Sequence, residues 1–211
     1  MAPVTGVPSQ AKRQAILTAA TEAFLHSGYA ASVDEIAAVA GVGKQTVYRH
    51  FGDKQALFLA AVAAARATTV PASSAAVPIP DDPLEGLTEL GERILAAGLS
   101  PTVAALHRLT IAEIGNHPEL SAHWGDGAEP FVDEEVAATL RRYDELGLLT
   151  VPEPARAARQ FPYLLITEGR MATAYGTRHL SPERRHEIAA DTADLIVRAH
   201  RPAGSPVTSR G

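Results

Sequence analysis

The feature that most constrains this chain is the helical spacing of its apolar residues. Apolar side chains recur at positions i, i+3, i+4 and i+7 along the whole sequence, whereas no alternation with period two persists anywhere. In the first such stretch, Ile16, Ala20 and Phe24 fall on one face of a helix. The spacing predicts an all-α fold in which each helix buries one apolar stripe.

Capping residues and glycines divide the first part of the chain into four expected helices. The first covers about residues 10–27, and Gly28 is placed to end it. The run Ser-Val-Asp-Glu has the form of a capping box that starts a second helix at Ser32. A Gly-Val-Gly turn, in which glycines can take positive φ, then leads to a short third helix over residues 44–51. Asp53 can cap a fourth helix that runs to about residue 67.

A proline-rich stretch then separates two predicted domains. Residues 68–83 contain four prolines with Ala and Ser, so we interpret them as a linker. The expected order is a disordered arm (1–9), an N-terminal three-helix helix-turn-helix domain within 10–67, the linker, a larger helical domain (84–200) and a disordered tail (201–211). Prolines and their capping neighbours predict further helices from 83, from 101, near 118–124, over 130–146, over 154 to about 177 and over 181 to about 200.

The composition excludes several classes of function. The chain has no cysteine, which removes disulfides, thiolate zinc sites and cysteine nucleophiles and fits a reducing cytoplasm. No apolar run approaches the roughly 20 residues that span a bilayer, so we expect a soluble protein. His107, Glu113, His117 and His123 do not share one helical face, and no phosphate-binding loop or nucleophile motif occurs. We therefore expect no metal, no cofactor and no enzymatic activity.

Charge is distributed unevenly along the chain. Its net charge is −5, yet the first 60 residues carry five Lys and Arg against four Asp and Glu. All three lysines, Lys12, Lys44 and Lys54, lie in that part. A small basic face on an acidic body fits a protein that touches phosphate at one end only.

The segment from Ser32 to Phe58, SVDEIAAVAGVGKQTVYRHFGDKQALF, has the layout of a helix-turn-helix. One helix packs through an alanine-rich face, glycines redirect the chain, and a second helix presents polar side chains at its N-terminal end. The segment resembles the DNA-binding domain of the TetR family of repressors, including the Tyr-x-His-Phe run followed by Gly-Asp-Lys and an apolar pair. The resemblance extends over about residues 10–65 and implies binding to operator DNA.

The resemblance also implies which residues read the bases. Lys44, Gln45 and Thr46 occupy the first turn of the expected recognition helix, where family members approach base edges in the major groove. Lys can donate to guanine, Gln can make a paired contact with adenine, and the Thr methyl can touch thymine. These three residues are the predicted determinants of specificity.

Other residues of the segment match positions that usually bind phosphate. They are Tyr48, His50 and Lys54, and the backbone amides at Ser32 are a further candidate. Arg49 faces the groove or its rim by its spacing. The alternative is structural, because Tyr48 can belong to the core and Lys54 can be a solvated charge.

The C-terminal domain resembles an AefR-type subgroup of the same family. The resemblance rests on the run HRLTIAE over 107–113, the His-Pro-Glu-Leu run from His117, and the Gly-Leu-Leu turn at 147–149 before Pro-Glu-Pro-Ala. It implies that two long helices within residues 154–200 pair with their copies as a four-helix bundle, and that preceding helices enclose a ligand pocket. Two apolar-faced helices with no further chain to cover them also favour a homodimer.

Two polar residues lie on apolar helical faces in this domain. His107 falls within the stripe of one helix and Glu168 within that of another, and a ligand is one partner that a buried imidazole or acid can find. We predict that His107, Trp124, Phe161 and Glu168 line a mainly apolar ligand pocket. The alternatives are a core histidine bonded to a backbone carbonyl, and a glutamate paired with Arg170 or with an arginine of the other subunit.

Together these patterns predict a cytoplasmic, homodimeric transcriptional repressor that a small, mainly hydrophobic ligand releases from a palindromic operator. The alternatives are a ligand-independent DNA-binding regulator or organiser, and an enzyme or carrier that merely has a pocket. The helix-turn-helix argues against the enzyme. The acidic body and the large second domain argue against the organiser.

Overall fold

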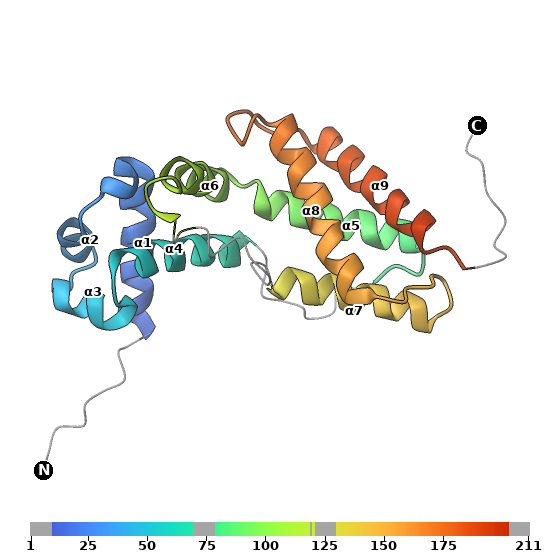
Figure 1. Cartoon of the computed structure of the whole chain (residues 1–211), viewed down its shortest axis with the longest axis horizontal. Helices are drawn as coiled ribbons and strands as arrows, with labels where there is room; N and C mark the ends of the chain where they lie inside the picture. The colour runs from blue at the N-terminus through green and yellow to red at the C-terminus, as the bar shows by residue number, and fades with distance from the viewer. Residues whose placement is uncertain (1–9, 70–78, 119, 121–129, 203–211) are drawn as a thin grey trace, which may run out of the picture. The chain divides into compact units, whose positions relative to one another are not determined.

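The computed structural model describes residues 10–69, 79–118, 120 and 130–202 (Figure 1). These residues form nine α-helices and one short 3-10 helix with no strand among them, which confirms the all-α prediction. The elements are α1 (Gln10–Ser27), η1 (Gly28–Ala30), α2 (Val33–Val39), α3 (Lys44–Phe51), α4 (Lys54–Thr69), α5 (Pro83–Gly98), α6 (Pro101–Glu113), α7 (Pro130–Glu145), α8 (Pro154–Ala172) and α9 (Pro182–Ala199).

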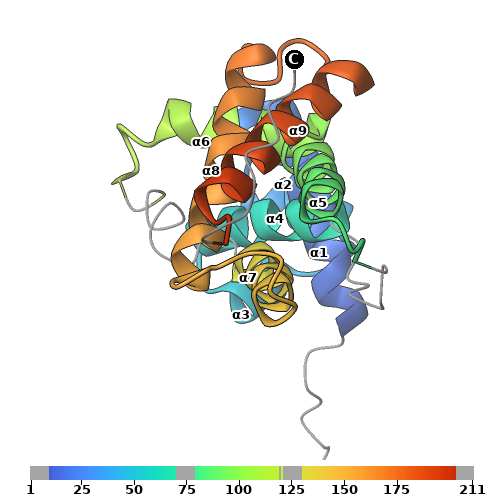
Figure 2. The same ribbon diagram turned by 90° about the vertical axis from the view of Figure 1, so that its right-hand side faces the viewer.

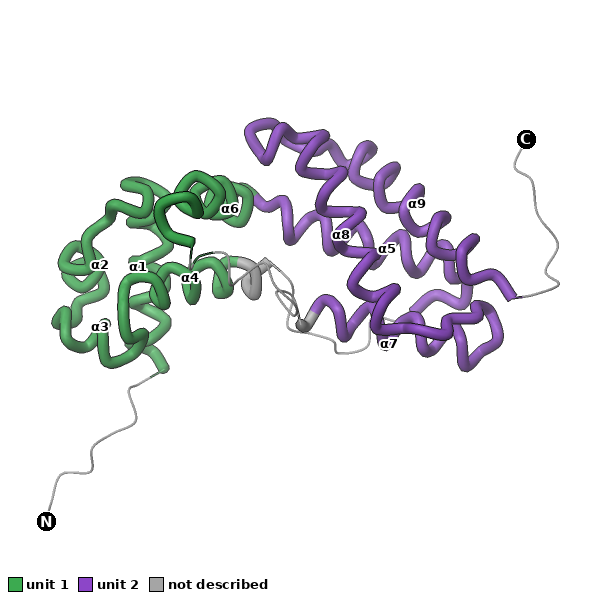
Figure 3. Tube along the Cα trace, in the orientation of Figure 1, with its two compact units in different colours: residues 1–69, 101–125 green, residues 70–100, 126–211 purple. Residues whose placement is uncertain are grey.

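The helices divide into two compact units, coloured separately in Figure 3. The first unit contains α1 to α4 together with α6, and the second contains α5 and α7 to α9. The sequence placed α6 in the larger C-terminal domain, whereas its packing groups it with the N-terminal helices. The physical reason is that Val103 and Leu106 of α6 are buried in the same core as α1 and α4.

An aromatic cluster lies in the core of the first unit. The rings of Phe24 on α1 and Phe58 on α4 meet edge to face with their centroids 5.0 Å apart. Tyr29 of η1 contacts Phe58 in the same manner at 5.2 Å. This cluster joins α1 to α4 and so forms the platform on which α2 and α3 rest.

Local interactions set the helix boundaries of the first unit as expected. Gly28 ends α1 with φ of +66°, and the Asp53 carboxylate caps α4 by accepting a hydrogen bond from the Ala56 amide at 2.7 Å. In the turn between α2 and α3, only Gly41 has a positive φ, +65°. Gly43 instead takes an extended conformation as the residue that precedes α3.

The second unit is a bundle in which α5 runs beside α9 and α7 beside α8, as Figures 1 and 2 show. Its core includes Phe161 and Leu165 of α8 and Ile188 and Ala193 of α9, all fully buried. Gly91 of α5 allows the close approach, because a Cβ there would lie 3.2 Å from the Ala189 Cβ. The apolar stripes predicted for these helices therefore serve as packing faces.

The penultimate helix is shorter than the sequence indicated. We expected it to reach about residue 177, but α8 ends at Ala172, and Ala174 and Tyr175 have positive φ values of 47° and 58°. The Thr173 hydroxyl stabilises this turn by donating to the Gly169 carbonyl at 2.8 Å and accepting from the Gly176 amide at 3.0 Å. A helical periodicity that continues through the turn concealed it.

Some sequence predictions fall outside the described residues. These are the arm at 1–9, most of the linker, most of the helix near 118–124 with Trp124, and most of the tail. Within the described part, no single helix is long and apolar enough to cross a membrane. One pair of described helices, α5 and α6, has the necessary length and composition when taken together, but the two are bent by 63° across the break at residues 99–100.

Candidate nucleic-acid interface

The third helix presents most of its side chains outward. Val47 is its one fully buried residue, whereas Lys44, Gln45, Tyr48 and Arg49 are exposed. Thr46 is half-buried. The three predicted base-reading residues therefore lie together in the first turn, and Tyr48 belongs to the surface rather than to the core.

The capping box predicted at the start of α2 is present. The Ser32 hydroxyl accepts a hydrogen bond from the Glu35 amide at 3.1 Å, and the Glu35 carboxylate accepts one from the Ser32 amide at 3.2 Å. Two of the backbone amides at this end are thus satisfied within the chain. A phosphate at Ser32 would have to use the amides that remain.

Lys44 has an acidic partner that sequence reasoning missed. Its Nζ lies 2.7 Å from the Asp34 carboxylate of α2, and both side chains remain largely exposed. The hydrogen bond to Asp34 raises the pKa of Lys44 above its ordinary value. The two residues are ten positions apart and meet only because the Gly41 turn folds α2 against α3, so no helical spacing could reveal the pair.

His50 is half-buried near the C-terminal end of α3. Burial lowers the pKa of its imidazole, and the cations Arg49, Arg13 and Lys12 lower it further. Its Nε2 atom is buried and has no hydrogen-bond partner within the part of the chain that the structure describes. Arg49 itself is exposed.

Lys54 lies over an aromatic ring at the start of α4. Its Nζ is 4.9 Å from the centroid of Tyr29, whose other neighbours include the His117 ring at 4.6 Å. A cation over a ring face is attracted by the ring quadrupole. Lys54 is thus half-buried and positioned, rather than a freely solvated charge.

The four residues predicted to bind a ligand are not brought together by either unit. His107 is buried in the first unit, whereas Phe161 is in the core of the second. Trp124 lies outside the described residues. Glu168 was expected on a buried face, but it is half-exposed and pairs with Arg184 of the same chain at 2.9 Å.

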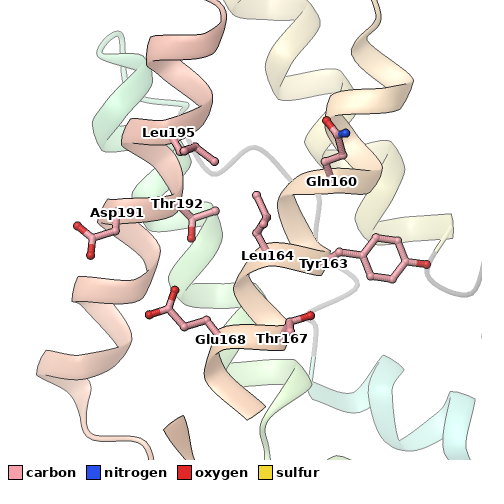
Figure 4. A pocket seen from close by; sticks show the side chains of 8 residues that line it. All are labelled: Gln160, Tyr163, Leu164, Thr167, Glu168, Asp191, Thr192 and Leu195. Carbon is pink, nitrogen blue, oxygen red and sulfur yellow. The ribbon is translucent and has the colours of Figure 1, made fainter. Parts of the chain in front are cut away.

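A surface groove of about 530 Å³ lies between α8 and α9 (Figure 4). Three large apolar side chains line it, Tyr163, Leu164 and Leu195, and they are 61%, 44% and 55% exposed. Gln160, Thr167, Glu168, Asp191 and Thr192 complete the lining. The groove therefore exposes apolar surface on the two helices that the sequence predicted to form a dimer.

A short helix that displays polar residues after a glycine turn and rests on a helical platform, in a chain that also has a second helical unit, defines a DNA-binding transcriptional regulator. Two family comparisons agree. The profile described as bacterial regulatory proteins, tetR family, matches residues 16–61, and that of the AefR-like transcriptional repressor C-terminal domain matches residues 85–202. The chain belongs to the TetR family, with a C-terminal domain of the AefR-like type.

Individual relatives are similar over different lengths. The transcriptional activator FasR of Mycolicibacterium smegmatis is 47% identical over 55 residues, which cover 26% of this chain and 25% of FasR. The transcriptional repressor AcnR of Corynebacterium efficiens is 28% identical over 187 residues, 86% of this chain and 93% of AcnR. The structure of the flavonoid-responsive regulator FrrA aligns with a TM-score of 0.68 and 26% identity, covering 93% of this chain and 100% of FrrA.

The ion pair between Lys44 and Asp34 leads to a test on DNA. Replacing Asp34 by Asn removes the charge that neutralises Lys44, so we expect tighter binding to random duplex DNA. The slope of log affinity against log salt should steepen by about one unit, as for one additional phosphate contact. Fluorescence anisotropy over a salt series measures both quantities.

Glu22→Gln is the matched control, because it removes one exposed negative charge from α1 of the same unit without touching Lys44. It should leave the slope unchanged. Weaker binding by Asp34→Asn would contradict the prediction and would mean that Asp34 positions Lys44 rather than neutralising it.

Proposed function

We propose that this regulator is a repressor that binds a palindromic operator through α3 and is released by a small, mainly apolar ligand. The observation that carries the proposal is the match of residues 85–202 to the AefR-like repressor domain. AcnR, which is similar over both units, is a repressor, whereas the likeness to the activator FasR covers only 55 residues. We therefore propose repression, because the repressor AcnR is similar to more of this chain than the activator FasR is.

In this proposal the first turn of α3 contacts the bases, and its later residues contact the DNA backbone. Lys44, Gln45 and Thr46 read base edges, while Tyr48, Arg49, His50 and Lys54, with the amides at Ser32, contact phosphates. An α-helix of eight residues is about 12 Å long, comparable to the width of the major groove. Its first turn can therefore reach the bases while its last turn lies near the groove edge.

Substituting Gln45 tests the base-reading role. Gln45→Ala should relax the preference at one operator position by about 1 to 3 kcal/mol, because a paired contact with a base edge is lost. Affinities for the operator and for its single-base variants measure this, starting from the DNA that flanks the coding region. Random duplex DNA is the internal control, and an equal loss of affinity on both DNAs would contradict the assignment.

The ligand in this proposal is an apolar or aromatic compound, and FrrA, which is described as flavonoid-responsive, supports that class. His107, Trp124, Phe161 and Glu168 remain the proposed ligand contacts. His107 and Phe161 are buried side chains of different units, and the Glu168 carboxylate pairs with Arg184. A ligand-independent regulator is the competing function, and the ligand assay separates the two.

Ligand release requires reciprocal coupling. A ligand that weakens operator binding must itself bind more weakly to the operator complex, by the same factor, typically 5- to 150-fold. We expect this result when a panel of flavonoids and other aromatic compounds is titrated calorimetrically against free and operator-bound protein. A compound that binds free and operator-bound protein with equal affinity would contradict the release mechanism, but not the proposed DNA recognition.

We further propose that a second copy of the chain covers the groove between α8 and α9, so that residues 154–200 form the dimer interface. A two-fold axis places the same apolar patch on both partners, which buries Tyr163, Leu164 and Leu195 against their copies. The same axis relates the α3 helices of the two subunits. A distance of about 34 to 36 Å between these helices would let them enter successive major grooves.

Light scattering tests the dimer. The wild-type protein should have twice the chain mass of 22.2 kDa at micromolar concentration, and Leu195→Glu should give the monomer, because it places a charge beside Glu168 and Asp191. Leu146→Glu is the matched control, since Leu146 is 53% exposed but follows α7. A wild-type monomer, or a dimer that withstands Leu195→Glu, would overturn this interface.

A further inference from the structure

Four basic side chains gather where the first turn of α1 meets the last turn of α3. The Arg13 guanidinium carbon lies 5.1 Å from the centroid of the Phe51 ring, and the His50 ring lies 6.0 Å from the same ring. Lys12 and Arg49 are close enough to His50 to lower its pKa, as Arg13 does. We call Lys12, Arg13, Arg49 and His50 the α1–α3 basic cluster.

The cluster has no acidic partner among the described residues. Within the part of the chain that the structure describes, none of its four members forms an ion pair, whereas Lys44 pairs with Asp34 and Arg184 pairs with Glu168 and Glu187. Like charges that face one another without a carboxylate repel, and a bound anion removes that repulsion. The buried Nε2 of His50 adds a polar atom without a hydrogen-bond partner among the described residues.

We propose that the α1–α3 basic cluster is a phosphate-binding site for the DNA backbone, so that Lys12 and Arg13 extend the interface from α3 onto α1. This inference rests on the proposed DNA recognition by α3. Because base reading takes place at the first turn of α3, the cluster at its last turn lies about one groove width away. Phosphates line the groove edge, and they are the anions that a duplex presents there.

The charge on α3 therefore differs between its two ends. At the N-terminal end, Asp34 neutralises Lys44, which limits the attraction of that end for phosphate of any sequence. At the other end, Lys12, Arg13 and Arg49 keep their positive charges for the DNA backbone. Contacts to phosphate carry affinity without sequence information, so Lys12 and Arg13 should contribute equally on operator and on random DNA.

The experiment measures binding of the full-length protein to a fluorescein-labelled random duplex and to the operator over a salt series. Lys12→Ala and Arg13→Ala should each reduce the slope of log affinity against log salt by about 0.9, and the double variant by about twice that. If the affinities of variant and wild type are equal at 1 M salt, this change of slope corresponds to about a fivefold lower affinity of each single variant at 0.15 M salt. The ratio of operator to random affinity should not change.

Arg141→Ala is the matched control, because it also removes one positive charge, but from α7, where Arg141 pairs with Glu134. Its slope should equal that of the wild type. Thermal unfolding identifies any variant that fails to fold. Lys12 is exposed and forms no ion pair among the described residues, so Lys12→Ala keeps the test decisive even where loss of the Arg13 stacking on Phe51 destabilises the unit.

The outcomes separate this inference from the function on which it rests. A wild-type protein that binds neither duplex would overturn the proposed function. Wild-type binding with unchanged slopes for Lys12→Ala and the double variant would overturn only the phosphate site on α1. A loss confined to the operator would also overturn it, because a backbone contact cannot distinguish sequences.

Discussion

The edge-to-face packing of Phe24 and of Tyr29 on Phe58 is the interaction on which the position of α3 depends. An isolated eight-residue helix is unstable in water, and α3 has one fully buried residue, Val47, with which to hold its place. Its orientation therefore comes from the platform of α1 and α4 beneath it, which the aromatic cluster joins. A recognition helix so exposed can change its outward residues without disturbing the core, because few of them contribute to it.

The sequence predicted the features that depend on neighbouring residues. The bounds of α1 and α3, the capping box at Ser32 and the Asp53 cap follow from interactions that span at most four positions, and the structure confirms them. The first turn of α3, which carries the proposed base-reading residues, could be located for the same reason. By contrast, the end of α8 was wrong, because a turn with positive φ at Ala174 and Tyr175 leaves no mark on the apolar periodicity.

Contacts between residues that are far apart in the chain could not be predicted from the sequence. The pairing of Asp34 with Lys44 requires the folded turn between α2 and α3, and that of Glu168 with Arg184 requires α8 to lie beside α9. The stripe around Glu168 was correctly apolar, but only part of it is buried within one chain. Leu164 of this stripe lines the groove between α8 and α9 together with Glu168, which explains how a surface acid could be mistaken for a buried one.

The packing of α6 with the N-terminal helices means that the unit carrying α3 is not continuous in the sequence. Val103 and Leu106 of α6 complete its core, and His117 packs on the Tyr29 ring that also holds Lys54. A chimera that joins residues 1–69 of this chain to the C-terminal domain of another regulator would lose those contacts. Such an exchange must carry residues 101–120 together with the N-terminal helices, because their side chains complete the core of that unit.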